Sequence, residues 1–346
     1  MPTHIGRNNV QKGRLKVEID MKFAMKSLVV ASTLAAVGIA NAAIVTANAG
    51  STITVTDPAG SGRKAEITLL STSGGALTFS NAEPGVPYDP TDSTTIGGLI
   101  SALNAGNIKM VGTTGTTYTE GFADDGQRAS ATAAGKVTVV TADDQTGQIL
   151  TVLTPAGAVQ TAPVTANIST GGTASVGNLK VDLVSKTIYA DLVGTNTATK
   201  TKAATTVTLN GQALWTFANI TGPTAISPTS LLAADPVAAM AKDGYTDIKK
   251  LSDARGTYYT ATANNALTGL SIVGGNTGAA FNFFVATLGL QKNGVSALGG
   301  VTDWGRLDSS LQVQVREVPS IPEPSTYALM GLGLVGVVAA ARRRAK

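Results

Sequence analysis

The chain has 346 residues, no cysteine, a single histidine (His4) and a formal net charge of +4. Residues 43–322 therefore contain neither histidine nor cysteine, which excludes a Ser-His-Asp triad, a Cys-His pair, a histidine metal site and a disulfide there. The remaining enzymatic routes are carboxylate chemistry, Ser-Lys chemistry and metals held by oxygen ligands.

Residues 21–42 have the three regions of a secretory signal peptide. A short basic start, Met21–Lys26, precedes the apolar run Leu28–Ile39, and Ala40-Asn41-Ala42 has the A-x-A form of a cleavage site. Cleavage after Ala42 makes Ala43 the mature N-terminus.

Residues 1–20 are polar and charged and lie outside this pattern. We interpret them as a mis-annotated N-terminal extension, with the true start at Met21 or Met25. A functional N-terminal arm is the alternative.

The body of the chain is predicted to be mainly β. It is rich in threonine, which favours strands, and its apolar residues alternate with polar ones in Thr52–Thr56, Lys136–Thr141 and Leu311–Val315. We therefore expect an α+β fold of antiparallel, sandwich-like β-sheets with a few short helices. A glycine-rich stretch, Asn167–Ala174, predicts a boundary between two β-rich modules, 43–170 and 171–320, the second with short helices.

The clearest hairpin prediction covers Asn178–Val193. Its two strands alternate polar and apolar residues and reverse at Ser185-Lys186, which places Ile188, Ala190 and Leu192 on the core face. Thr195–Thr206 is a polar Thr/Lys/Ala segment typical of a hairpin tip, and the proline-rich Gly85–Asp92 is predicted to be a surface loop.

Four segments are predicted to be helices from their apolar spacing and end signals. They are Thr94–Leu103, Asp235–Ala241, Asp247–Arg255 and Gly278–Gln291, the last closed by Asn293-Gly294. Phe281, Phe283 and Phe284 in the fourth are expected in the core. Lys249 and Lys250 are expected on the solvent face of the third.

Paired carboxylates precede glycine in two loops, Asp124-Asp125-Gly126 and Asp143–Gly147. Such loops could hold Ca²⁺ through oxygen ligands, but neither has the twelve-residue pattern or a closing glutamate. Solvated turns are the preferred interpretation, so we expect no metal site.

Two other patterns have both a functional and a structural interpretation. Asp182 and Asp191 could pair as acid and base, or belong to a surface charge cluster with Lys180 and Lys186. Gly274–Gly278 is a glycine-rich turn before a helix, without the Lys-Ser/Thr end of a phosphate loop, and we expect Asn276 or Thr277 to cap that helix. We predict no catalytic residue and no cofactor.

The C-terminus combines three features in fixed order. Pro322-Glu323-Pro324 keeps the chain extended, Tyr327–Ala341 is an uncharged apolar run, and Arg342, Arg343 and Arg344 follow it. At about 1.5 Å per residue the run spans some 22 Å, so it is predicted to form a single short transmembrane helix in the inner membrane.

This order resembles the sorting signal of PEP-CTERM proteins over residues 321–346. The resemblance implies a Gram-negative host, exosortase as the processing enzyme, signal peptidase and the secretion translocon as export partners, and release into a biofilm matrix with exopolysaccharide as a candidate contact. The stretch between Pro324 and Arg342 is slightly short for the family.

Removing the two ends reverses the sign of the charge. Ten of the 26 basic residues but only three of the 22 acidic residues lie outside 43–322, which leaves 16 basic and 19 acidic residues and a net charge of −3. We therefore expect no nucleic-acid partner.

Two classes of function remain open. The first is a non-enzymatic, exosortase-processed surface or extracellular-matrix protein with a structural or adhesive role. The alternative is a secreted carboxylate-dependent glycan hydrolase with Trp215 or Trp304 in its cleft, or a small-ligand binding module.

Overall fold

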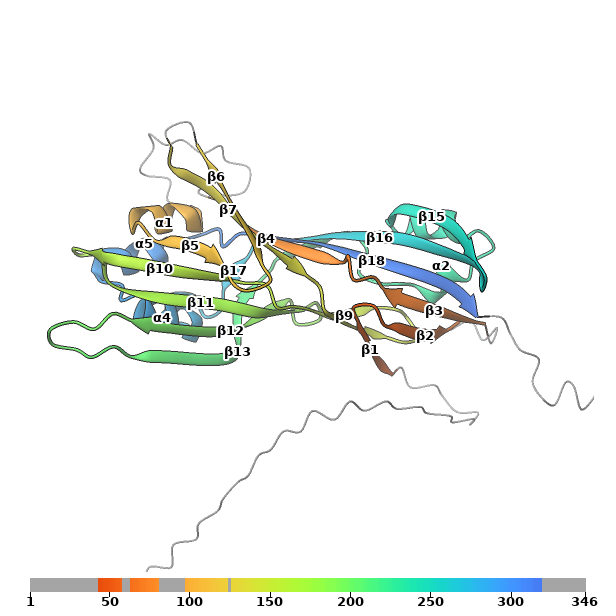
Figure 1. Cartoon of the computed structure of the whole chain (residues 1–346), viewed down its shortest axis with the longest axis horizontal. Helices are drawn as coiled ribbons and strands as arrows, with labels where there is room; N and C mark the ends of the chain where they lie inside the picture. Colours follow the sequence, from red (N-terminus) through yellow and green to blue (C-terminus); the bar gives the residue numbers. More distant parts are fainter. Residues whose placement is uncertain (1–42, 58–62, 81–96, 124–125, 319–346) are drawn as a thin grey trace, which may run out of the picture. The chain divides into compact units, whose positions relative to one another are not determined.

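The computed structural model describes residues 43–57, 63–80, 97–123 and 126–318 (Figure 1). Several predictions fall outside these residues: the signal peptide with Ala40 and Ala42, the extension 1–20, the loop Gly85–Asp92, the pair Asp124-Asp125, and the tail from Pro322 to Arg344. In the described part of the chain, no helix is both long and apolar enough to span a membrane.

The described residues form two nine-stranded sheets, and all pairings between named strands are antiparallel. The first sheet contains β1 (Ile44–Asn48), β5 (Lys109–Gly112), β8 (Val139–Asp143), β9 (Ile149–Thr154), β10 (Ala158–Thr165), β11 (Ser169–Asp182), β12 (Thr187–Asn196), β13 (Thr206–Thr216) and β17 (Ser271–Ile272). The second contains β2 (Thr52–Thr56), β3 (Lys64–Leu69), β4 (Gly74–Ser80), β6 (Thr117–Phe122), β7 (Arg128–Lys136), β14 (Asn219–Thr221), β15 (Thr246–Asp253), β16 (Gly256–Thr268) and β18 (Arg306–Val318).

Short helices complete the described fold. They are α1 (Leu99–Ala105), α2 (Pro228–Leu231), α3 (Pro236–Lys242), α4 (Ala279–Thr287), α5 (Lys292–Gly299) and the 3₁₀ helix η1 (Gly275–Thr277). The predicted class, mainly antiparallel and sandwich-like with a few short helices, is confirmed.

Two long strands, β11 and β18, organise the sheets. Along one edge β11 pairs with β12, and along the other it pairs first with β10 and then with β9. Strand β18 likewise pairs with β16 on one edge and with β4 and then β3 on the other. Each long strand therefore joins two parts of its sheet, as the ribbons of Figure 1 show for β18.

Two hydrophobic cores form along these strands. One includes Leu77, Leu192 and Trp215, and the other includes Val55 and Val313. Val152 and Leu183 pack against both cores.

The module boundary expected near residue 170 falls inside β11. Strand β10, from before this point, pairs with β11 across Ala158–Val176 to Thr165–Ser169, and both cores contain residues from before and after it. Residues 43–170 and 171–320 thus share both sheets.

The alternating patterns mark strands, with one difference. Thr52–Thr56 is β2 and Leu311–Val315 lies within β18, where Leu311, Val313 and Val315 are buried. The pattern Lys136–Thr141 is divided between β7 and β8, because the chain passes there from the second sheet to the first.

The hairpin prediction is confirmed, with a different turn. Val181 pairs with Ile188, and Ile188, Ala190 and Leu192 are buried. The reversal takes four residues, not two: Oδ1 of Asp182 accepts hydrogen bonds from the backbone N–H groups of Val184 and Ser185, and Lys186 has a φ of 50°. Residues 197–205 form the predicted polar tip between β12 and β13.

Among the predicted helices, Asp235–Ala241 is confirmed as α3, where Oδ1 of Asp235 caps the N–H of Ala238. Helix α1 begins later than expected, at Leu99, and ends at Ala105. The aromatic helix ends at Thr287, because Gly289 takes a φ of 61°, and a new helix, α5, begins where an end was expected. The three phenylalanines of α4 are buried, as predicted.

The helix prediction for Asp247–Arg255 is wrong. This segment is strand β15, which pairs Lys249 with Thr260 and Leu251 with Tyr258 and turns into β16 after Asp253. Backbone pairing to β16 stabilises the extended form, which a local apolar pattern does not register. Lys249 and Lys250 are exposed, but on a strand.

Candidate functional site

The predicted carboxylate loop at Asp143 is a turn. Oδ1 of Asp143 accepts hydrogen bonds from the backbone N–H groups of Gln145 (3.0 Å) and Thr146 (2.8 Å). These bonds, that of Thr146 foremost, lower the pKa of Asp143. Within the described ranges, no group of three or more His, Asp or Glu side chains could hold a metal ion.

Asp182 and Asp191 do not form a pair. Asp182 lies opposite Thr187 and Asp191 lies opposite Gly177, so their backbone positions are about 13 Å apart along β12, and the two side chains have different hydrogen-bond partners. Asp182 caps the turn described above. Asp191 accepts hydrogen bonds from Nδ2 of Asn178 (2.9 Å) and the backbone N–H of Gly211 (2.7 Å).

Neither predicted lysine neighbour joins these carboxylates in an ion pair. Nζ of Lys180 lies 5.6 Å from the ring centroid of Tyr189, and Nζ of Lys186 donates to the carbonyl of Ala218 at 3.4 Å. The four residues therefore have separate structural contacts.

Trp215 and Trp304 are buried in the larger core. The ring centroids of Trp215 and Phe79 are 6.1 Å apart. Neither indole is placed to stack against a sugar at the surface.

The glycine-rich turn before α4 forms η1, and Gly278 is the N-cap. The capping prediction for Asn276 and Thr277 is wrong. Nδ2 of Asn276 donates to the carbonyl of Gly299, and Oγ1 of Thr277 donates to the carbonyl of Gly274.

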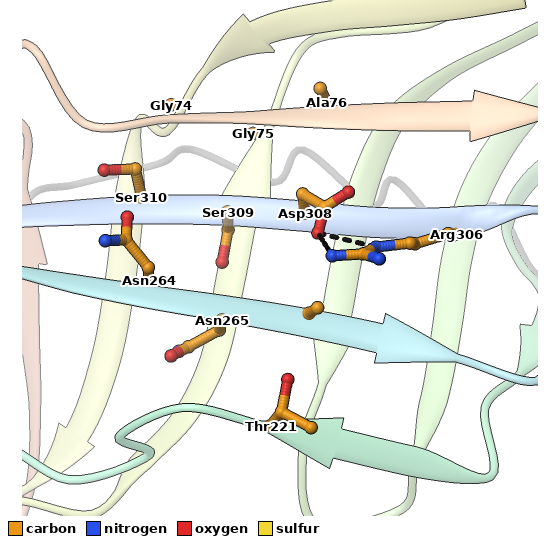
Figure 2. Close-up of a pocket in the computed structure, with 11 residues that line it drawn as sticks. Gly74, Gly75, Ala76, Thr221, Asn264, Asn265, Arg306, Asp308, Ser309 and Ser310 are labelled. Carbon is orange, nitrogen blue, oxygen red and sulfur yellow. Dashed lines mark hydrogen bonds and ion pairs between the residues drawn. The ribbon is translucent and has the colours of Figure 1, made fainter. Parts of the chain in front are cut away.

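A groove of about 500 Å³ crosses β4, β18, β16 and β14 in the second sheet (Figure 2). The register aligns Asn264, Ser310 and Gly74 in one row and, two residues along the strands, Ala266, Asp308 and Ala76 in another. The lining residues are Gly74, Gly75, Ala76, Thr221, Asn264, Asn265, Ala266, Arg306, Asp308, Ser309 and Ser310.

The groove forms because several of the residues that line it have small side chains. Gly74, Gly75 and Ala76 on β4 and Ser310 on β18 leave this part of the sheet without large side chains. A Cβ at Gly75 would lie 3.2 Å from the carbonyl oxygen of Asp308, so glycine also suits the close approach of the two strands.

The groove offers neutral hydrogen-bonding groups. Its one ion pair joins Arg306 to Asp308, with Nη2–Oδ1 at 2.6 Å and Nε–Oδ1 at 2.8 Å (Figure 2). Nδ2 of buried Asn265 donates to the carbonyl of Pro223, while its Oδ1 has no hydrogen-bond partner among the described residues. The arrangement suits a polar, uncharged ligand with hydroxyl groups.

Sequence reasoning missed this groove. The available signal was a Gly-Gly pair inside a strand pattern, which indicates close approach by another group. The residues on the facing strands come from more than 140 positions away in the sequence, so no local pattern joins them.

A second hollow, of about 700 Å³, lies between α1, β5 and β6. Two of its charged groups are paired: the guanidinium of Arg128 donates to Oε1 of Glu120 (3.0 Å) and to the carbonyl of Ile108 (2.7 Å). Burial, and then the bond to Glu120, raises the pKa of Tyr118. The ion pair therefore stabilises the β6–β7 hairpin.

Comparison with known families identifies the C-terminus. Residues 320–344 match the family model described as the PEP-CTERM protein-sorting motif. The chain carries a C-terminal exosortase sorting signal. The resemblance predicted from the sequence is thereby confirmed. Pro322, Glu323, Pro324 and Arg342–Arg344 all lie within the match.

The motif implies export and a surface or extracellular location, with exosortase as the processing partner. No curated protein matches the chain. The sorting motif starts two residues after β18 ends at Val318.

Proposed function

We propose that this chain is an exported cell-surface or extracellular-matrix protein with a structural or adhesive role and no enzymatic activity. The observation that carries the proposal is the sorting motif at residues 320–344. In this proposal signal peptidase removes residues up to Ala42, Tyr327–Ala341 holds an intermediate in the inner membrane of a Gram-negative host, and exosortase then processes the tail.

The position of the motif supports a folded cargo. Strand β18 is paired on both edges, and only Pro319 separates its end from the matched residues. At roughly 3.3–3.6 Å per extended residue, the four steps from Val318 to Pro322 reach at most about 14 Å. Exosortase therefore acts beside the second sheet, at the end where β18 pairs with β3.

The non-enzymatic role is supported by the separation of the predicted catalytic groups. Asp182 and Asp191 are committed to different backbone contacts, and both tryptophans are in the core. A glycan hydrolase needs two carboxyl groups about 5–10 Å apart beside the substrate.

An adhesive contact with exopolysaccharide is supported by the groove of Figure 2. Its amide and hydroxyl groups can exchange hydrogen bonds with sugar hydroxyls, and its small floor residues admit an extended polymer. A row of threonines adds a second polar surface on the first sheet, where Thr161, Thr173, Thr195 and Thr206 are successive partners.

The test of sorting is intact-mass spectrometry of the protein from an exosortase-positive host. The natural chain should lose its C-terminal residues, and Glu323→Gln should retain Lys346 and stay with the membrane fraction. Glu317→Gln is the control, because this exposed glutamate lies outside the motif. A natural chain that ends at Lys346 in that host would refute the processing proposal.

The adhesive role is tested by co-sedimentation with the host polysaccharide. Ser310→Tyr fills the groove and should abolish co-sedimentation. Gln314→Tyr, on the same side of β18 but outside the groove, should retain it. A natural chain that stays in the supernatant would reject the adhesive role without affecting the sorting result.

A further inference from the structure

Two hydrogen bonds join the backbone of Ala43 to Asp144. The N–H of Ala43 donates to Oδ1 of Asp144 at 2.8 Å, and the N–H of Asp144 donates to the carbonyl of Ala43 at 3.0 Å. The next residue, Ile44, is the first of β1 and pairs with Asp143 of β8. Asp144 therefore fixes the position of the residue that precedes β1.

The two neighbouring carboxylates have different tasks. Oδ1 of Asp143 accepts the N–H groups of Gln145 and Thr146 and so holds the β8–β9 turn. Asp144 is not needed for those bonds, and its side chain is directed to Ala43. A carboxylate that accepts a hydrogen bond from a backbone nitrogen binds more strongly when that nitrogen carries a positive charge.

We propose that Asp144 is the receptor for the α-ammonium group that signal-peptide removal creates at Ala43. The proposal rests on the predicted cleavage after Ala42. In the precursor, Ala43 offers one neutral amide N–H. After cleavage, the same nitrogen carries three N–H donors and a positive charge, so the hydrogen bond to Asp144 becomes an ion pair.

The consequence is a stronger edge strand in the exported protein. Strand β1 is a five-residue edge strand that pairs only with β8, and its Ala47 is buried in the smaller core. Short edge strands at a chain end open readily. An ion pair at the first residue opposes this opening only after cleavage, so processing and stabilisation of the first sheet coincide.

The test compares chains that start at Ala43 with a free or an acetylated amino group, each with Asp144 or with Asp144→Asn. Acetylation keeps the N–H donor and removes the charge, as the precursor's peptide bond does. The readout is amide hydrogen exchange across β1. With Asp144 present, acetylation should speed exchange about two- to fivefold, the range of an exposed ion pair. With Asp144→Asn it should have no effect.

The control is Asp308→Asn, which removes a carboxylate from the second sheet and should leave the acetylation effect intact. An acetylation effect of the same size with and without Asp144, or none in the natural chain, would overturn the ion pair. A mature N-terminus other than Ala43 in the host would overturn the link to processing. Neither result bears on exosortase, which acts at the other end.

Discussion

Ser169 joins β11 to the end of α4. The side chain is 1% exposed, its Oγ donates to the carbonyl of Leu288 at 2.6 Å, and it accepts the N–H of Gly171 at 2.8 Å. The next residue repeats the link, because the N–H of Thr170 donates to the carbonyl of Gly289 at 2.8 Å. We predict that Ser169→Ala destabilises the whole fold.

The magnitude follows from the two groups that lose their partner. The substitution removes only the hydroxyl, so the carbonyl of Leu288 and the N–H of Gly171 stay buried and unpaired. Each such group costs about 1–3 kcal/mol, so for the two groups we expect the free energy of unfolding to fall by about 2–6 kcal/mol in total. That is a large part of the roughly 5–15 kcal/mol that holds a typical domain folded.

The assay is urea unfolding of the chain that starts at Ala43, with the midpoint and the slope both measured. Ser175→Ala is the matched control, because Ser175 lies on the same strand and is half-buried. The control should change the free energy of unfolding by less than about 0.5 kcal/mol. Equal effects of the two substitutions would refute the assigned role of the Ser169 bonds.

Three further predictions use other contacts. Phe79→Ala should lower the free energy of unfolding by about 3–5 kcal/mol. Trp215→Phe should lower it less, because Nε1 of Trp215 is buried without a hydrogen-bond partner among the described residues and its removal breaks no bond. Thermal unfolding of both variants tests this order. Gly194→Ala should destabilise the protein by about 1–3 kcal/mol, since its Cβ would lie 2.5 Å from the carbonyl oxygen of Thr173, whereas Gly177→Ala has open space and should be near neutral; similar midpoints would contradict this. The lowered pKa of Asp143 means that its carboxylate stabilises the fold above about pH 4, its unfolded pKa, and that this stabilisation is lost as the pH falls through the folded pKa. Unfolding curves of the natural chain and Asp143→Asn should therefore differ at pH 7 and converge in acid, and a constant difference would count against the bonds to Gln145 and Thr146.

Several local features were predictable because their cause lies within a few residues. The cap of α3 needs only Asp235 and the backbone N–H of Ala238. The hairpin core face follows from the alternation that buries Ile188, Ala190 and Leu192. The turn between its strands was predicted with the wrong length, because the capping bonds of Asp182 extend the reversal to four residues.

The features that were missed depend on distant partners. Strand β15 is extended because it pairs with β16, and a local window does not contain that partner. The module boundary placed near residue 170 falls at the start of β11, which pairs there with β10 and is also hydrogen-bonded, through Ser169 and Thr170, to residues more than a hundred positions later. The groove likewise needs β4 beside β18, whose residues are separated by more than two hundred positions.

The sequence by itself determined the sorting signal, since the matched motif is a continuous run of residues 320–344. It also excluded histidine, cysteine and disulfide chemistry from residues 43–322, because composition needs no coordinates. The tertiary structure alone decided that Asp182 and Asp191 do not pair, which strands neighbour β18, and where the groove lies. The physical reason is that a motif or a composition is carried along the chain, whereas a site is made by residues that only long-range strand pairing brings together.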